Sequence, residues 1–233
     1  MKREVLVLCG GQGTRLQSVL GDRPKGLASI SGRAFLDILV DELLSQGFRR
    51  LVLCTGYGAE QIERHFSRRI DAEFVFSAEP APLGTGGAVR HALPLVHAEA
   101  FAVVNGDSFC RVAYAALFRL HERKGAAASV VLTPETERSD VGFAELAADG
   151  RVTSFNEKQA RTPLVNAGIY AFARELIERQ PAGAAFSLER ELLPQAIRAG
   201  ACYGYVVPGP LVDIGTPERY SAAQVSLKSV PDA

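Results

Sequence analysis

The segment Val5-Leu6-Val7-Leu8-Cys9-Gly10-Gly11-Gln12-Gly13-Thr14-Arg15-Leu16 joins an apolar run of five residues to three glycines within four positions. A stretch that can form a helix follows. The pattern predicts a buried strand that ends in a turn. Because glycine permits positive φ angles and a close approach of the backbone, such a turn can direct its N–H groups toward an anion.

Polyphosphate is the anion that suits this turn. Its spacing matches neither G-x-x-x-x-G-K-[ST] nor G-x-G-x-x-G, so it is not one of the two common phosphate loops. Arg15 supplies a cation where the first of those loops uses its lysine. A glycine-rich turn can also do no more than close a strand–helix junction. Thr14-Arg15 and the nearby Pro24-Lys25 favour phosphate binding.

The composition narrows the classes of protein to consider. The chain has 233 residues with 26 basic and 26 acidic side chains, so no overall field attracts nucleic acid or a membrane surface, and we expect neither as a partner. The length predicts one domain over residues 1–233, with a frayed tail from about residue 228. Four widely spaced cysteines and apolar runs too short for a membrane span or secretory core indicate a cytoplasmic protein with free thiols.

Strands and helices alternate through the first half of the chain, which predicts parallel βαβ units. After residue 133 the rhythm breaks, and a turn at Asp149-Gly150 predicts an antiparallel hairpin. We therefore expect an α/β fold: a Rossmann-like, doubly wound, mostly parallel sheet with an antiparallel insertion that binds sugar. Helices are expected at 35–46, 59–66, 114–124, 174–179 and 187–199, and strands at 51–55, 74–76, 101–104, 127–133, 166–172 and 203–207.

A second glycine cluster, Gly84-Thr85-Gly86-Gly87, opens a predicted helix after the third strand. Ligands of doubly wound sheets collect beyond the carboxyl ends of the strands, so the two glycine turns are expected to form two walls of one nucleotide cleft. Glu79 precedes the second turn. A carboxylate that accepts two parallel hydrogen bonds suits the N1–H and N2–H₂ edge of guanine, although a loop glutamate can also simply be solvated.

Two aspartates are candidate ligands for Mg²⁺. Asp107 follows a predicted central strand in Asn105-Gly106-Asp107, where hard oxygen ligands can hold the ion against phosphates. Such an aspartate can also form a turn or cap a helix. Asp213 lies between apolar residues, where a metal would offset the cost of burying a carboxylate.

Three polar residues near the antiparallel insertion are candidates for binding a sugar phosphate. Glu157 and Asn166 could hydrogen-bond to hydroxyl groups, and Lys158 could neutralise a second phosphate. Taken alone, Glu157-Lys158 is also compatible with a solvated pair of charges.

With these residues in order, the sequence resembles the sugar-1-phosphate nucleotidylyltransferases. Within them it is similar to the short bacterial D-glycero-D-manno-heptose 1-phosphate guanylyltransferases in its length, in Glu79 and in general likeness, and some short uridylyltransferases resemble it too. Seven motifs carry the resemblance: Gly10-Gly11-Gln12-Gly13-Thr14-Arg15-Leu16, Pro24-Lys25, Leu83-Gly84-Thr85-Gly86-Gly87, Asn105-Gly106-Asp107, Glu157-Lys158, Asn166-Ala167-Gly168-Ile169-Tyr170 and Asp213-Ile214-Gly215-Thr216-Pro217.

The resemblance implies transfer of a nucleoside monophosphate from GTP, or another NTP, to a sugar 1-phosphate, with Mg²⁺ as cofactor. It implies catalytic roles for Arg15, Lys25, Asp107 and Lys158, and a metal held by Asp107 and Asp213. It places the nucleotide on Leu8, Gly10, Gly11, Gly13, Thr14, Glu79, Gly84, Thr85 and Asp107, and the sugar phosphate on Gly142, Glu157, Lys158 and Asn166.

Other readings keep part of this chemistry. A UTP- or CTP-dependent enzyme acting on a hexose phosphate would differ in base or sugar. An inactive nucleotide-sensing protein would have no use for Lys25, Asp107 and Asp213 together, and a metal-dependent glycosyltransferase would be expected to carry paired aspartates at the strand end that holds Asp107. A homo-oligomer is compatible with all of these readings.

Overall fold

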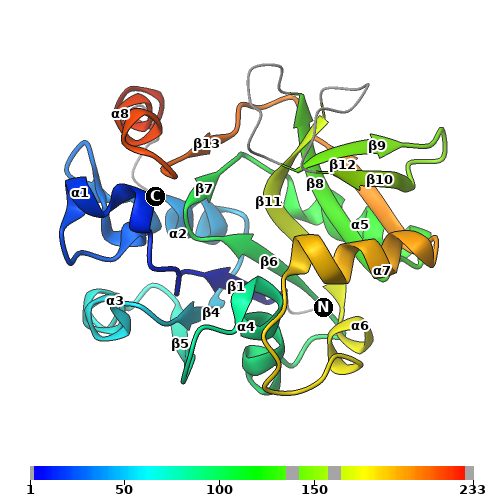
Figure 1. Ribbon diagram of the computed structural model, residues 1–233, viewed down its shortest axis with the longest axis horizontal. Helices are drawn as coiled ribbons and strands as arrows, with labels where there is room; N and C mark the ends of the chain where they lie inside the picture. Colours follow the sequence, from blue (N-terminus) through cyan, green and yellow to red (C-terminus); the bar gives the residue numbers. More distant parts are fainter. Residues whose placement is uncertain (1–2, 135–141, 157–163, 229–233) are drawn as a thin grey trace.

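The computed structural model describes residues 3–134, 142–156 and 164–228 (Figure 1). Its strands are β1 (Val5–Leu8), β2 (Ser29–Ile30), β3 (Arg33–Ala34), β4 (Arg50–Thr55), β5 (Glu73–Ala78), β6 (Ala100–Asn105), β7 (Ser108–Phe109), β8 (Ala128–Pro134), β9 (Phe143–Leu146), β10 (Val152–Asn156), β11 (Leu164–Ala173), β12 (Cys202–Val206) and β13 (Val212–Asp213). Its helices are α1 (Gln17–Leu20), α2 (Phe35–Ser45), α3 (Ala59–Phe66), α4 (Gly84–Ala92), α5 (Tyr114–Lys124), α6 (Arg174–Glu178), α7 (Leu193–Arg198) and α8 (Pro217–Ser226). Short 3₁₀ helices η1 (Thr14–Leu16), η2 (Lys25–Leu27) and η3 (Leu93–Leu95) and a π-helical segment η4 (Leu188–Leu192) complete the described elements.

Four parallel strands form one half of the main sheet in the order β5-β4-β1-β6. Strand β1 lies in the middle of this half, and its Leu8 is aligned with Cys54 of β4 on one side and with Asn105 of β6 on the other. The carboxyl ends of the three strands therefore lie at one edge, and the turns that follow them are brought together there.

The other half of the sheet is built around β11, which runs antiparallel to both β6 and β8. Strand β12 pairs in parallel with β8, and the β9–β10 hairpin is antiparallel, as expected from Asp149-Gly150. The register between β11 and β8 shifts between Asn166 and Tyr170, which marks a bulge in β11. The fold class expected from the sequence is confirmed, with the antiparallel half beginning directly beside β6.

Two apolar cores cover the two faces of the sheet. Because side chains alternate along a strand, Val5 and Val7 enter one core and Leu6 enters the other. The first core is filled mainly from α2, α3 and α5, and the second from α4, α6 and α7. Among the described residues, no helix is both long and apolar enough to cross a membrane.

Two small ladders lie outside the main sheet. Strand β13 pairs antiparallel with β7, and β2 pairs with β3. The C-terminal helix α8 lies beside the N-terminal part of the chain (Figure 1), where the hydroxyl of Tyr220 and the amide of Gln224 both donate to the Ser29 carbonyl at 2.7 Å. None of these short strands was expected from the sequence, since two-residue strands carry no readable alternation.

The helix expected over 187–199 begins as predicted, with Ser187 accepting hydrogen bonds from two backbone N–H groups. Its first part is π-helical, and the regular helix α7 starts at Leu193. Pro194 lies in the first turn of α7, where its missing N–H is tolerated, but it cannot donate to the turn before it. The change of helix type at this point follows from the proline.

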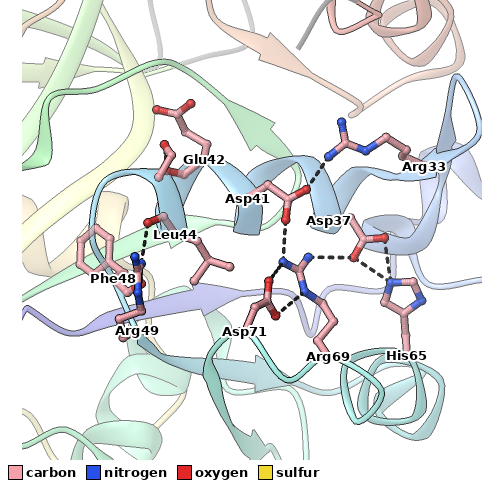
Figure 2. A network of polar contacts seen from close by, with 11 residues as sticks. Arg33, Asp37, Asp41, Glu42, Leu44, Phe48, Arg49, His65, Arg69 and Asp71 are labelled. Atoms are coloured by element: carbon pink, nitrogen blue, oxygen red, sulfur yellow. Dashed lines mark hydrogen bonds and ion pairs between the residues drawn. The ribbon is translucent and has the colours of Figure 1, made fainter. Parts of the chain in front are cut away.

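A cluster of ion pairs ties α2 to the segment after α3 (Figure 2). The Arg69 guanidinium lies between Asp37 and Asp41, one turn apart on α2, and Asp71. Arg69 Nη2 is 2.6 Å from Asp41 Oδ1, and Arg69 Nε is 3.1 Å from Asp71 Oδ1. His65 contacts both carboxylate oxygens of Asp37 at 2.9 Å. Arg69 and the four residues named with it are called the Arg69 cluster below.

Candidate functional site

A cleft of about 660 Å³ opens at the carboxyl ends of β1, β4 and β6. That volume is within the range of pockets that hold a small-molecule ligand. Every residue expected from the sequence to bind nucleotide lines the cleft: Leu8, Gly10, Gly11, Gly13, Thr14, Glu79, Gly84, Thr85 and Asp107, together with Arg15 and Lys25. Gln12, Tyr57, Asn105 and Gly215 also line it.

The first glycine turn is shaped by close backbone approaches. A Cβ atom on Gly10 would lie 2.9 Å from the Gly56 nitrogen, so the turns after β1 and β4 meet with no room for a side chain. Gly13 has φ of 60° and rests against Lys25. Gly11 has open space around it, so its backbone borders the cleft directly.

Lys25 and Asp107 form an ion pair at the mouth of the cleft. The Nζ–Oδ2 distance is 2.6 Å, and the hydroxyl of Ser108 donates to the other carboxylate oxygen at 3.2 Å. The side chain of Asp107 is 41% exposed, whereas that of Lys25 is 13% exposed. Most of the Lys25 side chain is therefore covered by neighbouring residues, whereas the Asp107 carboxylate is open to the cleft.

Asp213 is brought to Asp107 by the β7–β13 ladder. Asp213 is aligned with Ser108, and the Ile214 nitrogen donates to the Asp107 carbonyl at 3.1 Å. The Asp213 carboxylate accepts from the Gly215 nitrogen at 2.7 Å and lies 3.4 Å from an Arg219 nitrogen. Asp213 does not itself line the cleft, but Gly215, two residues further on, does.

The donor set at this place fits a hard divalent cation. Two carboxylates that are 106 positions apart in the sequence reach one end of β7 through paired strands. Oxygen ligands of this type suit Mg²⁺, which commonly takes one or two carboxylates and completes its shell with water and substrate phosphate. Among the described residues, no group of three or more His, Cys, Asp or Glu side chains has metal-binding geometry.

Glu79 lies at the far wall of the cleft, after β5. Its backbone N–H donates to the Thr55 carbonyl at 2.9 Å, and its Oε2 accepts from the Leu83 nitrogen at 2.9 Å. The other oxygen lies beside Gly10. The Glu79 side chain thus closes the loop 79–83 through its hydrogen bond to Leu83. This bond fixes the direction of the carboxylate that we expect to contact the base.

The second glycine cluster both borders the cleft and packs against the segment before η4. Gly84 and Thr85 line the cleft, but a Cβ atom on Gly84 would also lie 2.7 Å from the Phe186 carbonyl oxygen. A side chain on Gly86 would collide with the Phe186 ring, and the N–H groups of Gly86 and Gly87 bond to the Phe186 carbonyl. All three glycines are therefore required for packing, and of the three Gly84 also lines the cleft.

The residues expected to bind the sugar phosphate are only partly described. Asn166 begins the bulge of β11, where its Oδ1 accepts from the Gly168 nitrogen at 2.9 Å and its Nδ2 donates to the Tyr170 hydroxyl at 2.7 Å. Gly142 packs against the Phe155 ring, and its carbonyl accepts from the Asn166 nitrogen at 2.8 Å. Glu157 and Lys158 lie outside the described residues.

Sequence reasoning missed two polar residues near the cleft. Asn105 lines it at the end of β6, and its Oδ1 is buried with no hydrogen-bond partner in the described structure. Glu189, which lies in the helix expected over 187–199, joins Thr85 to Tyr170. The position of Asn105 at a strand end could have identified it, but no local pattern points to Glu189.

The thiols beneath the cleft are unreactive. Burial, with a smaller contribution from the nearby Glu79 carboxylate, raises the pKa of Cys9 to about 12, and burial likewise raises the pKa of Cys54. All four cysteines are free and buried, as the sequence predicts. Cys9 and Cys54 therefore serve as small apolar side chains at the floor of the cleft.

Comparison with known proteins agrees with this geometry. A D-glycero-alpha-D-manno-heptose 1-phosphate guanylyltransferase from Aneurinibacillus thermoaerophilus is 32% identical over 97% of this chain and 98% of its own length. A protein of the same name from Campylobacter jejuni is 33% identical over 93% of this chain and 96% of its own length.

Among solved structures, HddC from Yersinia pseudotuberculosis superposes with a TM-score of 0.84 at 32% identity, covering 95% of this chain and 98% of that one. The same protein has also been solved in complex with GMP-PN. Residues 4–229 of the chain match the nucleotidyl transferase family. The chain therefore belongs to the nucleotidyl transferase family.

Proposed function

We propose that this protein transfers the GMP group of GTP to a sugar 1-phosphate, D-glycero-D-manno-heptose 1-phosphate, to give the GDP-sugar and pyrophosphate. The observation that carries the proposal is the cleft itself, which gathers a glycine turn, Arg15, Lys25 and Asp107 at one sheet edge. The two relatives named as heptose 1-phosphate guanylyltransferases, which match over nearly their whole length, support the choice of base and sugar.

The reaction needs no protein nucleophile. An oxygen of the sugar phosphate attacks the α-phosphorus of GTP, and the bond from that phosphorus to the β-phosphate oxygen breaks as pyrophosphate leaves. The attacking group is already anionic near neutral pH, so no general base is required. Catalysis consists of positioning and charge stabilisation. In this assignment Arg15 and Lys25 neutralise the charge that develops on pyrophosphate, and the backbone of Gly10, Gly11 and Gly13 with Thr14 holds the phosphates.

Asp107 and Asp213 would hold Mg²⁺, which when bound would neutralise charge on the phosphates. Lys25 Nζ lies 2.6 Å from one oxygen of Asp107, so the lysine and this carboxylate share one part of the cleft. The partly buried position of Lys25 there supports its assignment to a phosphate group of the nucleotide.

Glu79 is proposed to select guanine. Each carboxylate oxygen has two acceptor sites, so the bond from the Leu83 nitrogen leaves capacity on both oxygens for N1–H and N2–H₂. Changing Glu79 to Gln puts an N–H₂ group against those donors. We expect the preference for GTP over UTP in kcat/KM to fall by about tenfold or more, since buried polar mismatches of this kind are costly. A preference that survives in a folded variant would contradict the assignment.

For the sugar phosphate, we propose Lys158 on the phosphate and Glu157, Asn166 and the Gly142 backbone on hydroxyl groups. Leu8, Gly84 and Thr85 would complete the part of the cleft that binds the nucleotide.

We further propose that residues 1–233 act as one nucleotidyltransferase domain in the cytoplasm. Its product would supply a heptose for capsule polysaccharide, and copies of the chain can associate. Light scattering of the purified protein tests the last point.

The experiment that tests the function measures pyrophosphate release with Mg²⁺. GTP, CTP, UTP, ATP and dTTP are crossed with the 1-phosphates of the heptose, mannose and glucose in both anomers. Turnover restricted to GTP and the heptose phosphate is the expected result. Activity with UTP or CTP and a hexose phosphate would replace the base or sugar assignment. Binding of GTP without turnover by any pair would indicate a nucleotide-sensing protein.

A further inference from the structure

Glu189, on the π-helical segment η4, contacts a residue that lines the cleft, Thr85, and the buried Tyr170 beside the proposed sugar site. Its Oε2 accepts from the Thr85 hydroxyl at 2.8 Å and from the Ser187 hydroxyl at 2.9 Å. Its Oε1 accepts from the Tyr170 hydroxyl at 2.9 Å. Thr85 starts α4 and Tyr170 lies in β11, so one carboxylate joins two elements that are far apart in the sequence.

On the Thr85 side, the carboxylate fixes a residue that lines the cleft. The Thr85 oxygen accepts from the Leu188 nitrogen at 2.9 Å while its proton is directed at Glu189. Backbone bonds from Gly86 and Gly87 to the Phe186 carbonyl hold the same two segments together. The first turn of α4 is thus held by η4 through both backbone and side chain.

On the Tyr170 side, the carboxylate sets the direction of a chain of hydrogen bonds. The Tyr170 hydroxyl donates to Glu189 and therefore offers its lone pairs to Asn166. The Asn166 amide therefore presents Nδ2 to Tyr170 at 2.7 Å and Oδ1 to the Gly168 nitrogen at 2.9 Å. Tyr170 is fully buried, and burial, with the charge of Glu189, raises its pKa, so it stays protonated.

We propose that Glu189 is a positioning residue that holds the nucleotide wall, through Thr85, and the sugar wall, through Tyr170 and Asn166, in one fixed arrangement. The inference rests on the proposed function, because it takes Thr85 as a nucleotide contact and Asn166 as a sugar contact. In-line attack requires both substrates to keep their relative place, and a group that binds both walls provides that without touching either substrate.

The test replaces Glu189 by Gln, which keeps the shape but can donate as well as accept. The matched control is Glu191→Gln on the same segment, since Glu191 is exposed and its Oε1 accepts only from the Ser187 nitrogen among the described contacts. For Glu189→Gln we expect the KM values for GTP and for the sugar phosphate each to rise about five- to tenfold, the scale of the net contribution of one hydrogen bond. The control is expected to keep both KM values.

A second variant separates the two walls. Tyr170→Phe removes the link to Asn166 and leaves the Thr85 bond intact, so it is expected to raise the KM for the sugar phosphate alone. Tyr170→Phe also tests the proposal if Glu189→Gln fails to fold. A merely structural role for Glu189 would lower the melting temperature and the active fraction with both KM values unchanged. That result, or an equal rise in the Glu191→Gln control, would overturn the proposal.

Calorimetric titration with GTP separates this inference from the proposed function. If the wild-type protein releases no pyrophosphate with any substrate pair, the proposed function fails. The Thr85 half of the inference still predicts that Glu189→Gln binds GTP about five- to tenfold more weakly than wild type and the control. Equal GTP affinities in all three proteins would then reject it.

Discussion

The Lys25–Asp107 pair and the Arg69 cluster both contain ion pairs of 2.6 Å, yet their surroundings differ. Arg69 meets three carboxylates, from Asp37, Asp41 and Asp71, at the seam between α2 and the segment after α3 (Figure 2). Lys25 meets Asp107 where parallel strands end, and both residues line the cleft. The first group joins two parts of the scaffold, whereas the second leaves a 41% exposed carboxylate facing a cavity.

The comparison teaches that the position of an ion pair in the fold indicates its role better than its distance does. In the Arg69 cluster, one guanidinium offsets the repulsion of two aspartates one helical turn apart, so its value lies in stability. At the cleft, the proposed function assigns both charges of the pair to ligand binding, and we expect stability to gain little from it. Substitutions in the two regions should therefore act on different quantities.

The largest expected effect is at the cleft. Lys25→Ala and Asp107→Asn should each reduce turnover by about two or more orders of magnitude, the scale of one lost transition-state contact. The free energy of unfolding should change by less than about 1 kcal/mol, because the pair is partly solvated. Steady-state kinetics and urea denaturation measure the two quantities. Near-normal rates in folded variants would remove these residues from the proposed mechanism.

Arg69→Met should show the opposite behaviour. It removes the guanidinium that Asp37 and Asp41 share, although Arg33 still pairs with Asp41 and His65 still contacts Asp37. The side chains of Asp37 and Asp41 are only 22% and 15% exposed. We expect the free energy of unfolding to fall by about 1–3 kcal/mol, less than for a fully buried pair, with KM and kcat per folded molecule unchanged. Asp71→Asn, at a more exposed member, should cost less. A changed KM for Arg69→Met would contradict the assignment of the Arg69 cluster to stability alone.

The smallest expected effect is the dependence of the free energy of unfolding on pH that His121 causes. His121 is buried against the Ser129 hydroxyl at 3.0 Å, and burial lowers its pKa from 6.5 to about 4. Below the ordinary pKa the unfolded chain binds a proton that the folded chain refuses, so stability falls as pH decreases from 6.5 toward 4. Between about pH 7 and pH 5 we expect a loss on the order of 1 kcal/mol.

Urea denaturation at both pH values checks this expectation. His121→Gln should flatten the pH dependence, whereas His91→Gln, at an exposed histidine of α4, should leave it unchanged. An identical slope in wild type and His121→Gln would show that other groups carry the dependence. The activity per folded molecule should not follow this titration, since His121 does not line the cleft.

Much of the cleft could be predicted because parallel strands bring their carboxyl ends to one edge. Once Val5–Leu8, residues 51–55 and residues 101–104 were recognised as strands, the turns after them had to meet. The roles of individual glycines could not be predicted in this way. Gly11 borders open space and Gly86 contacts the Phe186 ring, although both occur in similar glycine-rich runs.

By itself, the sequence determined the alternation of strands and helices and the convergence of the glycine turns with Arg15, Lys25 and Asp107. These features follow from local periodicity, which is set by residues a few positions apart. Only the tertiary structure decided that the two-residue ladder β7–β13 carries Asp213 to Asp107, and that Glu189 lies between Thr85 and Tyr170. Such contacts depend on the complementarity of single side chains across long separations, and no repeating pattern in the chain records them.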